Sequence, residues 1–239
     1  MSIPRSLTIE NLVCSRGDRT LFVDLNAQLS EKQCLHVIGS NGSGKTSLLR
    51  ILTGLAPAES GQVLWNQSKI NNNSDYLSSH AFIAHKDALK NELTAIENLR
   101  FYQRLNLSDQ TNSDQANNAA KSKSDLESQL DDCLDQLEIL HCADLLAQQL
   151  SFGQRRRLAF ARLLLKPYKI WILDEPFTGI DARGRELIEA LLKNHLENDG
   201  MIILTHHQSL QQSCLQGYLS ELHLESTSDL IQSNKSIGR

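Results

Sequence analysis

The chain has 239 residues, of which 40% are hydrophobic and 22% charged, a composition typical of a globular protein with a sizeable core. Its formal net charge of -4 gives no overall basic field, which argues against nucleic acid or an anionic membrane as a partner. The five cysteines lack CxxC spacing, so we expect reduced thiols rather than disulfides or a zinc site. No apolar run is long enough to cross a bilayer, and we expect a cytoplasmic chain.

The spacing of apolar residues predicts that strands alternate with helices. Two alternating segments, 6–16 and 19–30, predict an antiparallel hairpin. Short apolar runs that predict strands occur at 34–39, 61–67, from residue 82 onward, 169–175 and 201–207. Helical spacing of apolar residues occurs at 45–55, 94–105, 125–150 and 150–165. Strands that alternate with helices indicate a parallel sheet with crossover connections, so the expected fold class is α/β.

Two segments show no such pattern. Residues 106–124 have almost no large apolar side chains, and we interpret them as an exposed, mobile insertion. The tail beyond about residue 211 gives no clear indication of order.

A phosphate-binding loop is predicted at residues 39–46, "GSNGSGKT", between an expected strand and an expected helix. Its glycines let backbone N–H groups point at phosphate oxygens, and the following helix directs its positive dipole end to the same place. Lys45 supplies a positive charge for the terminal phosphates, and the Thr46 hydroxyl can ligate Mg²⁺. An incidental glycine-rich turn is the alternative, and the flanking elements argue against it.

Two carboxylates, Asp174 and Glu175, end the apolar run "IWILDE". Next to a phosphate-binding loop, Asp174 can hold Mg²⁺, often through water, and Glu175 can polarise an attacking water. Considered alone, they would be solvated carboxylates at a strand end.

A third motif, "LSFGQ", begins the predicted helix at 150–165. Ser151 and Gly153 stand where the helix starts, and such an N-terminus presents a hydroxyl and N–H donors to an anion. By itself the segment would be a capped amphipathic helix. Its position, shortly before Asp174, favours a functional role.

These motifs, in this order, resemble the ATP-binding subunits of ABC transporters over about residues 7 to 210. The loop at 39–46 is similar to Walker A, "LSFGQ" to the signature, "IWILDE" to Walker B and "TGID" (178–181) to the D-loop. The resemblance implies one ABC ATPase domain over 1–239: a P-loop NTPase core with a mainly parallel sheet, an N-terminal antiparallel β subdomain, and a helical signature subdomain at about 88–165.

The resemblance also implies the cofactors ATP and Mg²⁺ and the residues that hold them. The implied nucleotide contacts are Arg16, Gly39, Ser40, Asn41, Gly42, Ser43, Gly44, Lys45, Thr46, Ser47, Ser151, Gly153, Gln154 and Asp181. Thr46 and Asp174 would be the metal ligands. The implied catalytic residues are Lys45, Glu175 and His207.

The switch histidine of the family has two candidates in "LTHHQ", His206 and His207. The spacing from Asp181, with Gln208 taken as the residue after the switch, assigns the role to His207. Its ring would hydrogen-bond the γ-phosphate. We interpret His206 as an ordinary strand-end residue.

Two positions depart from the family pattern. Arg16 stands where many members have an aromatic that stacks on adenine, and a guanidinium plane can also lie on a base. Lys86 stands where the family has a glutamine whose oxygen reaches Mg²⁺ or water. Lysine has only donors and cannot ligate Mg²⁺, and His85 is a poor substitute because Mg²⁺ prefers oxygen. Lys86 would then add charge near the γ-phosphate, contact a membrane partner, or remain solvated.

A closer resemblance is to the ATP-binding subunits of the cytochrome c maturation system, carried by "GQVLW", "LTAIENLRFY", "WILDEPFTGID" and "ILTHHQSL". It implies integral membrane permease subunits as partners, haem handling, and a peripheral location on the cytoplasmic face of the inner membrane. A second copy of the chain would complete each ATP site, and no nucleic acid is expected. The alternatives are an ABC exporter subunit for another substrate, a soluble ABC ATPase that remodels a protein or nucleic acid complex and, more distantly, a small-molecule P-loop kinase.

Overall fold

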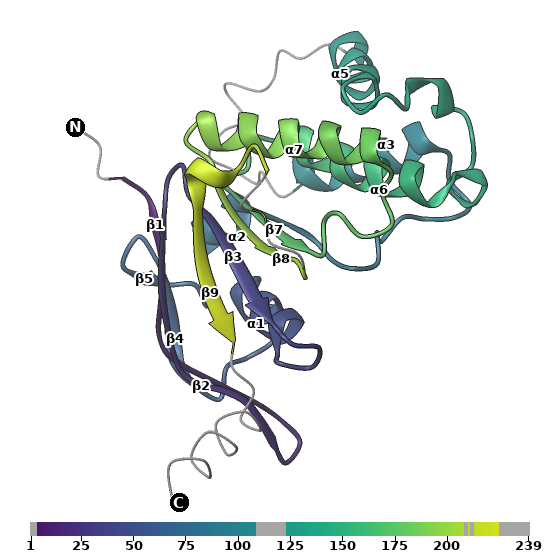
Figure 1. Cartoon of the computed structure of the whole chain (residues 1–239). Helices are drawn as coiled ribbons and strands as arrows, with labels where there is room; N and C mark the ends of the chain where they lie inside the picture. Colours follow the sequence, from purple (N-terminus) through teal and green to yellow (C-terminus); the bar gives the residue numbers. More distant parts are fainter. Residues whose placement is uncertain (1–3, 109–122, 208–209, 211–212, 225–239) are drawn as a thin grey trace, which may run out of the picture. The chain divides into compact units, whose positions relative to one another are not determined.

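The computed structural model describes residues 4–108, 123–207, 210 and 213–224, shown in Figure 1. The chain divides into two compact units. The first unit comprises 1–85, 169–176 and 192–239, and the second unit comprises 86–168 and 177–191.

An antiparallel sheet in the first unit has the strand order β2-β1-β4-β5. Its strands are β1 (Ser6–Arg16), β2 (Arg19–Ser30), β4 (Ser60–Trp65) and β5 (Ser68–Lys69). Strands β1 and β2 pair from Ser6 with Ser30 to Arg16 with Arg19. The predicted N-terminal hairpin and antiparallel subdomain are therefore confirmed.

A second sheet in the first unit is parallel throughout, in the order β6-β7-β8-β3-β9. Its strands are β6 (His80–Ile83), β7 (Ile170–Asp174), β8 (Met201–Thr205), β3 (Cys34–Gly39) and β9 (Leu219–Leu224). The predicted α/β class with a parallel sheet is confirmed. Strand β9 lies beyond residue 211, in the segment whose order could not be predicted from the sequence. It is an edge strand with few buried residues, so its composition resembles that of a loop.

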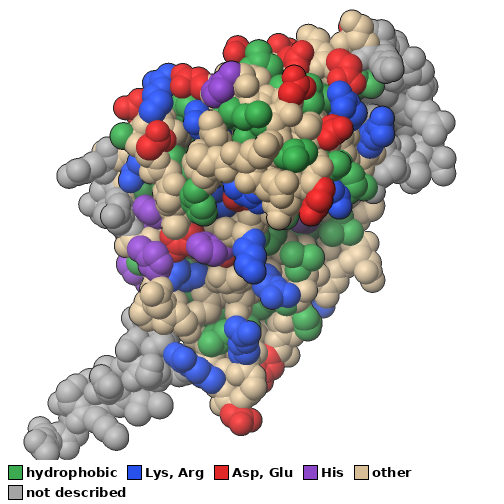
Figure 2. All heavy atoms as spheres, turned by 90° about the vertical axis from the view of Figure 1, so that its right-hand side faces the viewer, with side chains coloured by type: hydrophobic (Ala, Val, Ile, Leu, Met, Phe, Trp, Pro, Cys, Tyr) green, Lys and Arg blue, Asp and Glu red, His purple; other side chains and the backbone are tan. Residues whose placement is uncertain are grey.

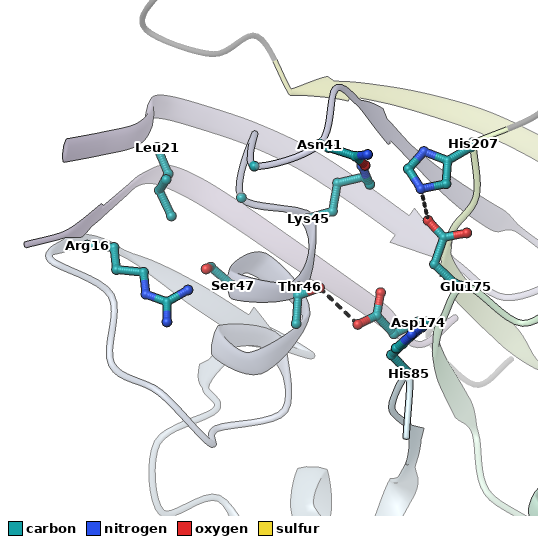
Figure 3. A pocket seen from close by; sticks show the side chains of 12 residues that line it. Arg16, Leu21, Asn41, Lys45, Thr46, Ser47, His85, Asp174, Glu175 and His207 are labelled. Atoms are coloured by element: carbon teal, nitrogen blue, oxygen red, sulfur yellow. Dashed lines mark hydrogen bonds and ion pairs between the residues drawn. The ribbon is translucent and has the colours of Figure 1, made fainter. Parts of the chain in front are cut away.

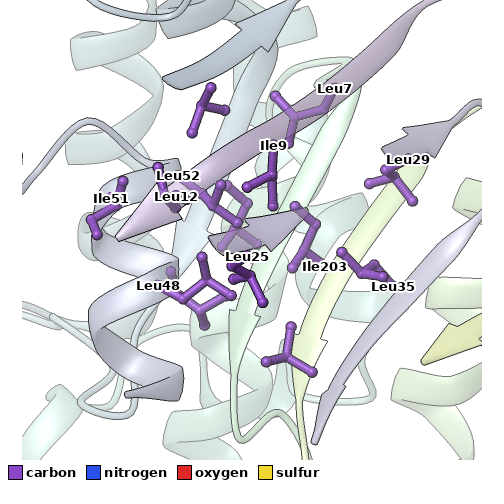
Figure 4. Close-up of a cluster of buried hydrophobic side chains, with 14 of the residues drawn as sticks. Leu7, Ile9, Leu12, Leu25, Leu29, Leu35, Leu48, Ile51, Leu52 and Ile203 are labelled. Atoms are coloured by element: carbon purple, nitrogen blue, oxygen red, sulfur yellow. The ribbon is translucent and has the colours of Figure 1, made fainter. Parts of the chain in front are cut away.

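Helix α1 (Lys45–Leu52) follows β3 and packs its apolar face into the core between the two sheets. Figure 4 shows Leu48 and Leu52 of this helix near Leu12 of β1. The helix ends just before Gly54, which adopts a positive φ of 72°, and the Leu55 N–H donates to the Arg50 carbonyl. The short helix α2 (Ser74–Ser79) also belongs to the first unit and lies just before strand β6.

The second unit is helical. Among its described residues, the α-helices are α3 (Ala95–Ser108), α5 (Lys123–Asp135), α6 (Phe152–Ala161) and the part of α7 (Ala182–Glu197) up to Leu191. The prediction of one helical segment over 125–150 is wrong after Asp135. Glu138 has a φ of 53°, and Ile139 N–H bonds the Leu134 carbonyl at 2.9 Å, which ends the helix. Only short 3₁₀ turns follow, η1 (Leu140–Cys142) and η2 (Ala147–Gln149), and another, η3 (Arg162–Leu164), follows α6.

The predicted insertion at 106–124 is helical at both ends, since its first residues belong to α3 and its last to α5. The remainder, 109–122, lies outside the described residues. All five cysteines are free, and four of them are buried. Within the described ranges, no helix combines the length and apolar character that crossing a bilayer requires.

A ring stack between the buried Trp171 and the half-buried His195 lies in the first unit. The indole of Trp171 on β7 stacks on the imidazole of His195, with ring centroids 3.8 Å apart and planes 5° from parallel. His195 Nε2 also lies 3.3 Å from the Met201 carbonyl. Burial lowers the pKa of His195 from 6.5 to about 4, in spite of its contacts with the Met201 and Lys169 carbonyls.

This histidine should make the fold less stable in acid. Because the folded-state pKa lies below the unfolded value, the unfolded chain alone binds a proton as the pH falls from 6.5 toward 4, and the free energy of unfolding falls with it. Between pH 7.5 and 5 we expect a loss of about 2 kcal/mol from this group, measured by urea unfolding. His195→Phe keeps the ring stack but should no longer show this pH-dependent loss of stability. His141→Gln, at an exposed site, should show the same loss as the wild type. Equal pH dependence in the wild type and His195→Phe would contradict the assignment.

Candidate active site

A cavity of about 300 Å³ in the first unit gathers residues from distant parts of the sequence. Its lining residues are Arg16, Leu21, Asn41, Gly42, Gly44, Lys45, Thr46, Ser47, His85, Asp174, Glu175 and His207. Figure 3 shows Arg16 and Leu21 on one side of Lys45 and Thr46, and Asp174, Glu175 and His207 on the other. On the face seen in Figure 2, histidine side chains gather among acidic and basic ones.

The loop between β3 and α1 needs its glycines. Gly42 and Gly44 have φ values of 82° and 105°, which L side chains rarely adopt. A Cβ on Gly44 would also lie 3.1 Å from atoms of Leu21 and Phe22. This backbone brings the N-terminus of α1 to the cavity, where its partial positive charge suits a phosphate.

Lys45 lies against the loop that carries it. Its ammonium donates hydrogen bonds to the carbonyls of Gly39 (2.7 Å) and Ser40 (3.2 Å). The side chain is largely buried, yet it lines the cavity. Ser43 is buried and does not line the cavity. The loop therefore holds a fixed cation at the wall of the cavity.

Asp174 joins the loop helix to the neighbouring strand. Its Oδ2 accepts a hydrogen bond from Thr46 Oγ1 at 2.9 Å, and its Oδ1 accepts one from Thr205 Oγ1 at 2.7 Å. The carboxylate of Asp174 and the hydroxyl of Thr46 are adjacent oxygen donors at the cavity wall, which is the ligand chemistry that Mg²⁺ prefers. The residues present therefore fit the metal.

Glu175 adopts a left-handed backbone conformation with φ of 51°. Its N–H donates to Thr205 Oγ1 at 2.9 Å, so one hydroxyl is bonded to both acidic residues. Such a conformation is costly for a non-glycine residue and is often found at functional sites. Thr205 was not singled out in the sequence. In the sequence it is a single threonine at the end of an apolar run, and its register with Asp174 is visible only in the fold.

Two histidines flank the Glu175 carboxylate. His207 Nε2 lies 3.0 Å from one oxygen, and His206 Nδ1 lies 3.5 Å from the other. Burial alone would raise the pKa of Glu175, but the His206 contact and the charges of His207, His206 and Lys45 hold it below its ordinary value. The carboxylate is therefore ionised at neutral pH. The interpretation of His206 as an ordinary strand-end residue needs correction, since it is buried and contacts Glu175.

The signature residues belong to the second unit, whereas every residue that lines the cavity belongs to the first. Ser151 caps α6 in a reciprocal pair with Gln154: its hydroxyl accepts from Gln154 N–H, and its own N–H donates to the Gln154 side chain. Gly153 has open space around its Cα. Asp181 caps α7 by accepting from Gly184 N–H at 3.0 Å.

The segment after Lys86 is fixed to the signature helix within the second unit. The Arg156 guanidinium, only 2% exposed, donates to the Asp87 carboxylate at 2.8 Å. Arg162 donates to the Asp87 carbonyl at 2.9 Å. Lys86 itself is exposed and does not line the cavity, whereas its neighbour His85 does.

Thr205→Val should show how much the shared hydroxyl contributes to stability. The substitution keeps the shape but removes two hydrogen bonds at a fully buried position. We expect the free energy of unfolding to fall by about 1–3 kcal/mol, measured by urea unfolding. Thr53→Val is the matched control, because that largely buried hydroxyl makes one hydrogen bond, to the Arg50 carbonyl. A Thr205→Val protein that loses no more stability than Thr53→Val would contradict the shared role.

Known proteins resemble the chain in sequence and in fold. The ABC transporter family matches residues 22–178. The cytochrome c biogenesis ATP-binding export protein CcmA of Histophilus somni (strain 129Pt) is 42% identical over 211 residues, covering 88% of this chain and 90% of the relative. The protein of the same name from Aliivibrio fischeri (strain ATCC 700601 / ES114) is 40% identical, covering 85% and 93%.

Among solved structures, a dimeric ATP-binding cassette in a post-hydrolysis state, bound to ADP and Pi, has a TM-score of 0.75 at 23% identity, covering 92% of this chain and 96% of that one. An ATP-binding subunit of an ABC transporter has a TM-score of 0.74 at 18% identity, covering 98% and 95%. These likenesses confirm the fold. The chain belongs to the ABC transporter ATP-binding family, in which ATP hydrolysis is coupled to transport.

Proposed function

We propose that the chain is the ATP-hydrolysing subunit of an ABC complex for cytochrome c maturation and haem handling. The observation that carries the proposal is one cavity lined by Lys45, the Thr46–Asp174 pair and the ionised Glu175. The cytochrome c assignment rests on the relatives, which are named for cytochrome c biogenesis and are about 40% identical over most of both chains.

The residues of the cavity take separate parts in phosphoryl transfer to water. The loop N–H groups and Lys45 bind the phosphates, and Arg16 and Leu21, on the other side of Lys45, accommodate the base. Thr46 and Asp174 hold Mg²⁺, which when bound neutralises charge on the phosphates. Glu175 accepts a proton from the attacking water, and the lowered pKa keeps its carboxylate ready to do so. His207 lines the cavity and contacts Glu175. In this proposal its ring hydrogen-bonds the γ-phosphate.

A second copy of the chain completes each site in this proposal. Ser151, Gly153 and Gln154 form the N-terminus of α6, and the space around Gly153 lets a phosphate approach its backbone. These residues and Asp181 would meet the nucleotide held by the partner copy. A cassette of similar fold, bound to ADP and Pi, is dimeric, which supports a second copy in this proposal.

The partners proposed outside the cassette are integral membrane permease subunits, which would hold the chain on the cytoplasmic face of the inner membrane. The relatives' names describe export proteins, and export requires a path through the membrane. The energy of hydrolysis would reach those subunits through the second unit, where the Asp87–Arg156 pair ties the segment after Lys86 to the signature helix.

Purification of the tagged chain from detergent-solubilised membranes should recover integral membrane partners together with a haem absorption spectrum. The Lys45→Ala chain is the control, because it lacks the proposed phosphate-binding cation and therefore shows which partners bind without nucleotide. Membrane partners without haem-handling subunits or haem would contradict the cytochrome c role and leave the transporter ATPase. Recovery of ribosomes or nucleic acid in place of membrane proteins would favour the soluble remodelling alternative.

Lys86→Gln should lower partner-stimulated ATP hydrolysis. We propose that Thr46, Asp174 and water would hold Mg²⁺, because lysine offers no acceptor, and that the exposed Lys86 contacts a membrane partner. Magnesium titrations of basal and partner-stimulated hydrolysis would separate an effect on metal binding from an effect on coupling. Lys90→Gln, another exposed lysine of the same segment, is the control. Unchanged titrations and rates in Lys86→Gln would exclude a catalytic or coupling role for Lys86.

A further inference from the structure

Two buried histidines lie next to the catalytic end of the parallel sheet without lining the cavity. His36, on β3, is 1% exposed, and His206, directly after β8, is 7% exposed. His36 is in register with Leu204 of β8 and Glu221 of β9. An imidazole in the middle of a buried strand is costly unless its polar atoms are used, so its contacts indicate its role.

The contact of His36 is with the backbone of His206. His36 Nε2 lies 3.2 Å from the His206 carbonyl oxygen. Because a carbonyl can only accept, Nε2 must carry the proton and donate. Burial lowers the pKa of His36, more than the His206 carbonyl and nearby Glu221 raise it, so the ring is neutral and Nδ1 carries the lone pair. Nδ1 has no partner among the described residues, which is consistent with this tautomer.

The carbonyl that His36 holds belongs to the residue pair that contacts Glu175. The ring of His206 approaches one carboxylate oxygen of Glu175, and the ring of His207 approaches the other. Thr205, immediately before them, bonds the Glu175 backbone. The hydrogen bond from His36 therefore fixes the chain at the point where it leaves the sheet and presents both rings to the carboxylate.

We propose that His36 is a positioning residue for hydrolysis: by bonding the His206 carbonyl, it keeps the rings of His206 and His207 on the carboxylate of Glu175. The inference rests on the role proposed for Glu175. It assigns His36 a function that requires a donor at Nε2, whereas a residue that only fills the core requires volume alone. The other titratable groups that act on His36 are Glu221 and His223, and Lys45 acts on Glu175.

Paired substitutions at residue 36 separate the two roles. His36→Gln keeps an N–H donor at similar reach, and His36→Leu keeps an apolar side chain of similar size without a donor. We expect His36→Leu to lower the kcat of ATP hydrolysis by about 3- to 10-fold, the loss that one hydrogen bond predicts, with KM for ATP nearly unchanged. His36→Gln should restore most of the kcat. Leu35→Met, at the adjacent buried position, is the packing control and should keep wild-type kcat.

Urea unfolding of each variant shows whether it is folded, and His36→Phe provides a second donor-free side chain if His36→Leu is not. Equal kcat in the glutamine variant and the folded donor-free variant would overturn the inference. A raised KM for ATP with kcat unchanged would overturn it as well. A wild-type chain that does not hydrolyse ATP, alone or with its partners, would overturn the proposed function and this inference together.

Discussion

The hydrogen bonds at the Thr205 hydroxyl are the constraint on which the catalytic end of the sheet depends. One oxygen donates to the carboxylate of Asp174 and accepts from the backbone of Glu175, and Asp174 in turn accepts from Thr46 at the start of α1. Because β7 and β8 are parallel and in register there, the loop helix and both strands meet at one carboxylate. The left-handed backbone of Glu175 is tolerated because these bonds determine it.

Much of the fold could be predicted from apolar spacing. The hairpin of β1 and β2 and the buried strands β3, β7 and β8 have patterns that burial imposes directly. The errors occur where the local pattern does not decide the backbone. Leu137 and Ile139 continue the apolar spacing of α5 into the core, yet Glu138 between them leaves the helix. Strand β9 is defined by its pairing with β3, which is a non-local interaction.

The parts of the candidate site that lie in short sequence motifs could be predicted. The loop from Gly39 to Thr46 and the carboxylates of Asp174 and Glu175 combine glycines, a cation and acids in a spacing that few other functions need. Thr205, His206 and His36 act through hydrogen bonds between strands, and a lone threonine or histidine in an apolar run gives no such signal. Sequence reasoning therefore finds the groups proposed to contact the ligand more readily than the groups that position them.

The central claim is that Glu175 drives hydrolysis in a site that only two copies can complete. Light scattering of Glu175→Gln with ATP and Mg²⁺ tests it most directly, because the amide keeps the shape of the side chain but cannot accept the proton. The account predicts that this variant accumulates as an ATP-bound dimer with negligible hydrolysis, and that adding Ser151→Arg abolishes the dimer. A Glu175→Gln chain that remains monomeric with ATP bound, or hydrolyses ATP at the wild-type rate, would contradict it.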